Sequence, residues 1–291
     1  MRSRLRLFLT LAALSLIAGL AVSWIVGSAM VQGHPSDVSA AEPPARDFEL
    51  RSAGGVVLAA TYRPGARRDS PAVLLLHGVR ASRAVTDPAA RWLSSLGYAT
   101  LTIDFRGHGE STMRRRSFGL DESADARAAF AWLKRRQRGA RVAVIGSSLG
   151  GAASLLGREG PLPADALVLQ AVYPDIRSAI RNRIAARLTA APAYLLEPLL
   201  SLQSKPRFGV WPWELSPRQA LRRYRGPVLV IGGAEDRYTP PEETRALYAA
   251  APGPKALWLV PHGGHAELGN LGHPATREQV RRFLHHTIGP P

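Results

Sequence analysis

Residues 146–150 read Gly-Ser-Ser-Leu-Gly, and they separate an apolar run at 142–145 from a run of small residues. A strand, a tight turn and a helix in this order are typical of a turn that forces its central residue, Ser148, into strained backbone angles. Gly146 and Gly150 suit this turn because a side chain at either position would collide with it. The stretch therefore predicts one hydroxyl presented at the edge of a sheet, beside the positive end of a helix.

Two later strands predict the partners that would make this hydroxyl reactive. Asp236 follows the apolar run 228–231, and His265 follows the run 256–260. The carboxyl ends of parallel strands meet at one edge of a sheet, so we expect both side chains near Ser148. His265 would take the proton from the hydroxyl, and Asp236 would orient the imidazole. The alternatives are Glu235 or Asp175 as the acid and His262 as the base.

A nucleophilic serine also needs two N–H groups aimed at the oxygen on which negative charge develops. We expect one from Leu149, directly after the serine, and one from Val79, in the loop that follows an apolar strand at 72–76. Gly78 would let this loop approach the site closely. We interpret His77 as a supporting residue, because it precedes the turn that supplies the N–H group.

The rest of residues 47–291 predicts a mostly parallel, doubly wound α/β sheet. An antiparallel hairpin turning at Gly54-Gly55 opens it, and strands then alternate with helices. About fifty residues, 174–225, separate two strands that a simple crossover could join, and we expect them to form a small helical cap. The predicted later strands are 72–76, 99–103, 142–145, 166–172, 228–231 and 256–260.

The N-terminal segment is apolar enough to cross a membrane. Arginines at positions 2, 4 and 6 precede an uncharged stretch, 7–31, which as a helix spans about 37 Å against a hydrocarbon layer of about 30 Å. We expect residues 1–31 to anchor the chain in the membrane, with the catalytic domain outside the cytoplasm. Trp24 is then expected to lie at the outer membrane–water interface.

The alternative for this segment is a cleaved signal peptide, for which Val38-Ser39-Ala40 offers a small-residue cleavage site and which would leave a secreted protein. The apolar stretch is longer than the roughly 7–15 residues usual in signal peptides, and we therefore favour the anchor. Residues 32–46 contain three prolines and predict a linker.

Composition excludes several kinds of site. The chain of 291 residues has no cysteine, which rules out disulfides, thiolate metal sites and a cysteine nucleophile. Its net charge of +16 comes almost entirely from scattered arginines, without a zinc-finger or helix-turn-helix pattern, so we expect no nucleic-acid partner. We expect neither a metal nor an organic cofactor, because the chemistry above needs only side chains and backbone N–H groups.

Together these residues resemble the α/β-hydrolase superfamily, from about residue 47 to the C-terminus. The resemblance adds the segment 104–111, Asp-Phe-Arg-Gly-His-Gly-Glu-Ser, which is similar to a supporting turn of that family. It implies a triad of Ser148, Asp236 and His265, in the order usual for this fold, with Val79 and Leu149 as oxyanion donors. Within the superfamily the chain is similar to the branch of serine aminopeptidases and dienelactone hydrolases, which includes membrane-anchored bacterial serine hydrolases.

The predicted activity is therefore that of a carboxylesterase. We expect it to cleave the acyl ester of a small or lipid-like molecule through an acyl-enzyme on Ser148. An aminopeptidase or an acyltransferase could use the same triad, and a non-catalytic binding module is the remaining alternative.

Overall fold

The computed structural model describes residues 2–268 and 271–291. The strands are β1 (His34–Pro35), β2 (Arg46–Ser52), β3 (Val56–Arg63), β4 (Ala72–Leu76), β5 (Ala99–Ile103), β6 (His108–Gly109), β7 (Val142–Ser147), β8 (Ala166–Gln170), β9 (Val228–Gly233) and β10 (Lys255–Val260). The helices are α1 (Arg2–Val31), α2 (Arg83–Ser95), α3 (Glu122–Arg136), α4 (Leu149–Leu155), α5 (Ile176–Ala185), α6 (Ala190–Ser201), α7 (Ser204–Phe208), α8 (Pro217–Leu221), α9 (Pro241–Ala250) and α10 (Pro274–Ile288).

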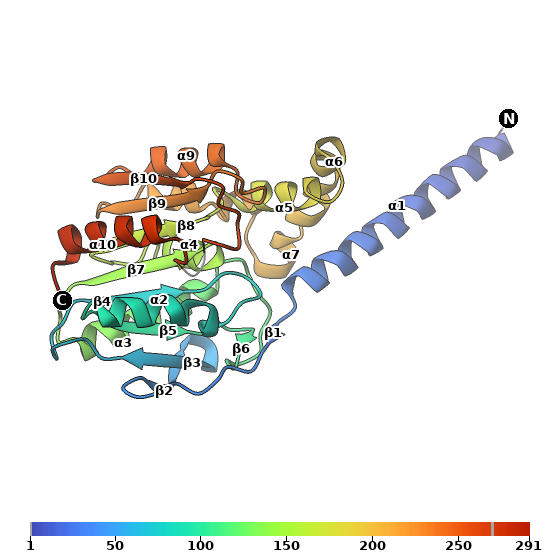
Figure 1. Cartoon of the computed structure of the whole chain (residues 1–291). Helices are drawn as coiled ribbons and strands as arrows, with labels where there is room; N and C mark the ends of the chain where they lie inside the picture. The colour runs from blue at the N-terminus through green and yellow to red at the C-terminus, as the bar shows by residue number, and fades with distance from the viewer. Residues whose placement is uncertain (1, 269–270) are drawn as a thin grey trace.

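Eight of these strands form one sheet, in the order β10-β9-β8-β7-β4-β5-β3-β2 (Figure 1). The strands from β10 to β5 are mutually parallel, and β3 and β2 are added antiparallel at one side. β2 and β3 form the predicted hairpin, and it turns where Gly54 and Gly55 both have φ of 71°. Such positive φ values favour glycine, since it has no side chain to clash there. The predicted mostly parallel sheet and its opening hairpin are thus confirmed.

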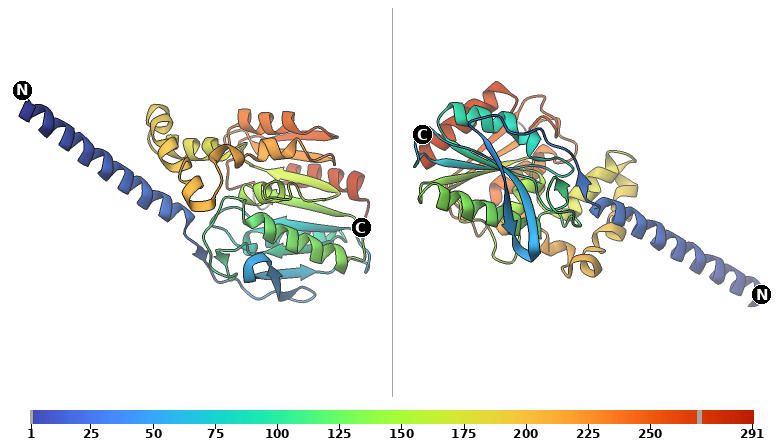
Figure 2. Two further views of the ribbon diagram at one scale, coloured as in Figure 1. Left: turned by 180° about the vertical axis from the view of Figure 1, so that it is seen from behind. Right: turned by 90° about the horizontal axis from the view of Figure 1, so that it is seen from below.

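Helices cover both faces of the sheet, as Figure 2 shows from two sides. Side chains of α2 and α10 pack into one buried cluster, and those of α3, α4 and α9 pack into another on the opposite face. Every residue of β4, β5, β7 and β8 is buried. These strands are covered on both faces, which accounts for their continuous apolar runs. Their carboxyl ends are thereby held in a rigid core.

The predicted cap follows β8 and consists of the helices α5, α6, α7 and α8, with a short 3-10 turn at Pro212–Glu214. Its last helix begins with Ser216 as N-cap, whose hydroxyl accepts a hydrogen bond from the N–H of Gln219 at 3.3 Å, and with Pro217 in the first turn. These are the residues that predict a helix start there. α5, α6 and α7 lie on the same side of the sheet from which α1 departs (Figures 1 and 2).

α1 is one continuous helix of 30 residues, of which Ser3–Val31 is long and apolar enough to cross a membrane, with a mean hydropathy of 2.2. The segment after it lies along the domain. His34–Pro35 pairs with His108–Gly109 as two parallel strands, and Ala45 is buried. The stretch predicted as a linker is therefore attached to the domain directly after α1, which fixes where the helix leaves it.

Candidate active site

Ser148 occupies the sharp turn between β7 and α4, and its backbone is strained as predicted, with φ 46° and ψ −105°. Its N–H donates to the carbonyl of Gln170 at 2.8 Å. A Cβ atom at Gly146 would lie 2.5 Å from the nitrogen of Gly151, and one at Gly150 would lie 2.2 Å from the oxygen of Leu76. Side chains at the two glycines would thus collide with α4 and with the neighbouring strand β4, which is why the turn can be so tight.

Asp236 and His265 form the hydrogen bond that the sequence predicts. Nδ1 of His265 lies 2.8 Å from Oδ2 of Asp236, and the carboxylate is completely buried. The other oxygen, Oδ1, accepts the backbone N–H groups of Tyr238 and Thr239 at 2.8 and 2.9 Å. The carboxylate is therefore fixed by the loop after β9, and it holds the imidazole in one orientation.

The alternative acids and base lie elsewhere. Glu235 and His262 pair with each other at 2.7 Å, with side chains 61% and 89% exposed. Asp175 caps the N-terminus of α5, where it accepts the N–H of Ser178 at 2.9 Å. A solvated ion pair and a helix cap are ordinary structural roles, and neither needs a part in catalysis.

The hydrogen bond predicted between Ser148 and His265 is not formed in this structure. Oγ of Ser148 is buried and has no hydrogen-bond partner within residues 2–268 and 271–291, so the predicted bond from Ser148 to His265 is absent there. The two residues follow β7 and β10 at the same edge of the sheet, and Tyr238, whose ring centroid lies 5.5 Å from that of His265, stands between the imidazole and the cap. Catalytic hydrogen bonds are often long without a ligand and tighten when substrate binds.

Val79 and Leu149, the predicted oxyanion donors, line one pocket together with Ser148. A Cβ atom at Gly78 would lie 3.8 Å from Cβ of Ser148, an ordinary contact beside the reactive group. His77 is fully buried, and its Nε2 accepts the N–H of Phe105 at 3.1 Å. Nδ1 then carries the proton and donates to the carbonyl of Gly78 at 2.7 Å. Burial lowers the pKa of His77 to about 4, which keeps the ring neutral.

The pocket at Ser148 is apolar except for one cation. Its walls come from the end of α1, from the loop after β4 and from α5, and the charged residue among them is Arg183. Within the described chain no carboxylate lies within ion-pair distance of Arg183, whose guanidinium is 5.4 Å from the ring centroid of Tyr238. Burial lowers the pKa of this guanidinium. The lining residues are Met30, Val79, Phe118, Ser148, Leu149, Tyr173, Ile176, Ala179, Ile180 and Arg183.

A network of buried charges supports the loops around the pocket. Asp104 is buried and pairs with the guanidinium of Arg83, and its Oδ2 accepts the N–H of Glu110 at 3.0 Å. The guanidinium of Arg106 makes two hydrogen bonds to Asp125, at 2.7 and 2.9 Å. The segment 104–111 has the supporting role that the family resemblance implies. The roles of Arg83 and Asp125 cannot be seen in the sequence, because charged residues within helical patterns look like a solvated face.

In the part of the chain that the structure describes, no three side chains of His, Asp or Glu gather closely enough to hold a metal ion.

The comparisons with known proteins agree with this arrangement. Residues 68–206 match the family described as serine aminopeptidase, S33. An uncharacterised protein of Mycobacterium tuberculosis is 32% identical over 260 residues, which are 88% of this chain and 84% of that protein. The chain belongs to the serine aminopeptidase family of α/β-hydrolases. The Bacillus subtilis protein YqkD is also similar, being 30% identical over 75% of this chain and 73% of its own length.

Two of the similar proteins have names that describe a hydrolase activity. The rat lysophosphatidylserine lipase ABHD12 is 29% identical over 65% of this chain, which spans about half, 48%, of that lipase. An esterase of Pyrococcus furiosus has the same fold, with a TM-score of 0.67 and 23% identity over 89% of this chain and 99% of the esterase. The predicted α/β-hydrolase fold is confirmed, and the chain is a hydrolase of this superfamily.

Proposed function

We propose that this protein is a serine hydrolase that cleaves acyl esters through an acyl-enzyme on Ser148. The observation that carries the proposal is the buried Asp236–His265 hydrogen bond at the same sheet edge as a strained, buried serine. Buried hydroxyls normally have a hydrogen-bond partner, so an unpaired one in an apolar pocket marks a functional group.

Each group has one task in the proposed reaction. Nε2 of His265 takes the proton of Ser148 as its oxygen attacks the acyl carbonyl, and the N–H groups of Val79 and Leu149 stabilise the oxyanion. The imidazolium then gives that proton to the leaving alcohol as the ester bond breaks. Water, activated by the same imidazole, releases the acid from Ser148 and restores the hydroxyl.

Charge in the pocket favours an ester over a peptide. An aminopeptidase must bind the ammonium group of its substrate, which calls for an acidic side chain near the serine. The pocket instead contains Arg183 and apolar residues, which suit an acyl chain and a neutral or anionic substrate. The esterases and the lipase among the similar proteins support the same choice.

The anchor is also part of the proposal. α1 is the helix that would cross the membrane, and the three arginines before it would keep the N-terminus in the cytoplasm and place the hydrolase domain outside. Burial of Ser23, Gly27 and Val31 against the rest of the protein supports retention of this helix over its removal as a signal peptide.

A fluorophosphonate probe tests the nucleophile. The full chain is expected to be labelled, and Ser148→Ala is expected to remain unlabelled, while Ser147→Ala, the matched change one residue earlier, is expected to retain labelling. Labelling of Ser148→Ala at the wild-type rate would refute the assignment. Rates on p-nitrophenyl esters of graded chain length and on aminoacyl nitroanilides then separate esterase from aminopeptidase, and we expect turnover of the esters.

A further inference from the structure

Helix α6 of the cap has its polar and apolar sides reversed. The side chains of Ala193, Glu197 and Ser201 are buried against the protein. Leu195, Leu199 and Leu202, at spacings of four and three residues, are 76%, 40% and 47% exposed. A helix on the surface of a water-soluble domain normally buries its leucines and exposes its acids. We call the outward residues Tyr194, Leu195, Leu196, Leu199 and Leu202 the cap's apolar face.

Ion pairs fix this orientation. The carboxylate of Glu197, which is 1% exposed, lies 3.0 Å from the guanidinium of Arg177 and 3.6 Å from that of Arg181, both on α5. Turning α6 about its axis to bury the leucines would carry Glu197 away from α5 and break both of these ion pairs. The apolar face is therefore held outward by the protein's own polar contacts.

The same helix packs on the end of α1. The hydroxyl of Ser23 donates to the carbonyl of Leu199 at 2.8 Å, and the amide of Gln203 donates to the carbonyl of Ser23 at 3.0 Å. Arg207 stacks 3.9 Å from the ring centroid of Trp24 and donates to its carbonyl at 2.9 Å. Leu199, a member of the cap's apolar face, thus lies against α1.

The length of α1 determines where the cap lies relative to the bilayer that this helix would cross. In its uncharged stretch, residues 7–22 are all exposed, and as a helix they span about 24 Å at ~1.5 Å per residue. A hydrocarbon layer is about 30 Å thick. The exposed stretch is therefore about one helical turn shorter than the hydrocarbon layer is thick. If α1 crosses the bilayer, the hydrocarbon layer must also cover the next turn of the helix, which contains Ser23 and Trp24, and this is the level at which α6 is attached.

We propose that the cap's apolar face lies in the outer part of the leaflet that α1 enters, so that the partner of this surface is the lipid bilayer. Charge supports lipid as the partner: from Ile176 to Phe208 there are six basic residues and one acidic residue, a balance that suits anionic headgroups. Trp211 and Trp213, which stack at 4.9 Å and are partly exposed, supply the aromatic side chains that favour a membrane interface.

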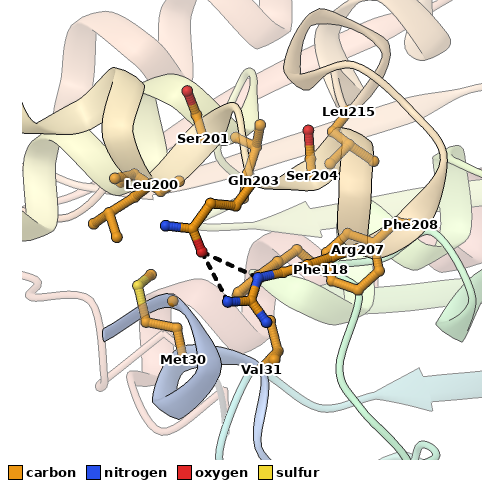
Figure 3. A pocket seen from close by; sticks show the side chains of 13 residues that line it. Met30, Val31, Phe118, Leu200, Ser201, Gln203, Ser204, Arg207, Phe208 and Leu215 are labelled. Atoms are coloured by element: carbon orange, nitrogen blue, oxygen red, sulfur yellow. Dashed lines mark hydrogen bonds between the residues drawn. The ribbon is translucent and has the colours of Figure 1, made fainter. Parts of the chain in front are cut away.

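The membrane contact also gives the substrate a route, a step that rests on the proposed function. A second pocket lies where α1 meets the cap, with Met30 and Val31 on one side and Leu200 and Phe208 on the other (Figure 3). It shares Met30, Phe118, Ile176 and Ile180 with the pocket at Ser148. An acyl chain that leaves the leaflet along α1 would pass these apolar side chains before it reaches the serine. The substrate class that this path favours is an ester of a membrane lipid.

Spin labelling tests the membrane contact. Since the chain has no cysteine, Leu195→Cys gives one nitroxide site in the full-length protein, reconstituted in vesicles of phosphatidylcholine and phosphatidylglycerol. The matched control is Arg68→Cys, on an exposed loop; the preceding residue, Arg67, donates to the carbonyl of the C-terminal Pro291 at 3.4 Å, and the C-terminus lies at the end of the domain away from α1 (Figure 1). We expect the label at 195 to be more accessible to oxygen than to a water-soluble nickel chelate, and the label at 68 to show the reverse.

Two outcomes would overturn the membrane contact. Equal, water-like accessibility at both sites would show that the cap stands clear of the bilayer. Shielding of the label at 195 from both relaxing agents would show that a protein, or a second copy of this chain, covers the face.

Activity tests the route. Leu195→Glu, compared with Arg68→Glu, is expected to lower hydrolysis of a lysophospholipid in vesicles by about tenfold and to leave hydrolysis of soluble p-nitrophenyl butyrate unchanged. Equal loss on both esters would refute the route. A wild-type protein that hydrolyses neither ester would count against the proposed function, while the spin-label result would still decide the membrane contact.

Discussion

Replacing Asp236 by asparagine separates the chemistry of the site from the folding of its loop. Oδ1 accepts two backbone N–H groups, from Tyr238 and Thr239, and an asparagine can keep both of these bonds. The amide nitrogen then takes the place of Oδ2, 2.8 Å from Nδ1 of His265, and presents a donor where the carboxylate presented an acceptor. The imidazole must accept this bond at Nδ1 and carry its proton on Nε2, where it can no longer take the proton of Ser148.

The expected loss in kcat is about 10⁴-fold, the size seen when a triad loses its correct tautomer, which corresponds to about 5.5 kcal/mol in the activation free energy. Hydrolysis of p-nitrophenyl butyrate measures the loss, and the free energy of unfolding in urea is expected to change by less than about 1 kcal/mol. Asp236→Ala is the contrasting variant. It leaves two backbone N–H groups without an acceptor and is expected to lose about 1–3 kcal/mol of stability as well. A kcat of Asp236→Asn within about tenfold of wild type would refute the assigned role.

Three further predictions concern the pocket and its support. Arg183→Met is expected to raise KM for an anionic ester by at least about tenfold more than it raises KM for a neutral ester, because Arg183 is the cation in the pocket. Equal changes in KM for the two esters would contradict this role. Asp104→Asn is expected to lower the free energy of unfolding by about 1–3 kcal/mol, measured in urea, since it removes the charge from one of the two carboxylates, Asp104 and Glu110, that pair with the buried Arg83. The pKa of His77 is about 4 in the folded protein, against an ordinary value of 6.5. As the pH falls, His77 is therefore protonated in the unfolded chain before it is protonated in the folded protein. The free energy of unfolding is expected to fall by roughly 3 kcal/mol between these two pH values. Urea titrations at several pH values measure this fall, and His77→Gln should make it shallower; an unchanged slope in that variant would show that other groups cause it.

The centre of the sheet could be predicted because its strands are buried on both faces. Continuous apolar runs such as 72–76 and 142–145 are typical of strands with helices on either side, and the glycines at 54 and 55 occupy a turn that needs positive φ. The Asp236–His265 contact could be predicted because each residue follows an apolar strand and parallel strands end together.

The missing contact at Ser148 and the supporting charges could not be predicted in this way. The position of His265 relative to the serine depends on the loop after β10, and a loop's path is set by many weak contacts that leave no periodic pattern in the sequence. Arg83 and Asp125 lie on helices and meet their partners only in the folded protein. The reversed helix α6 was predicted only as part of a helical cap, because its outward leucines look like core residues in a linear pattern.

The end of α1 is at once the last part of the anchor and a wall of the substrate pocket, since Met30 lines the cavity at Ser148. A protease cutting between residues 32 and 46 would release the domain with one side of that cavity open to water. With the anchoring proposed above, such release would thus lower the hydrolase activity instead of dispersing it, and no soluble pool of competent hydrolase would build up away from the membrane.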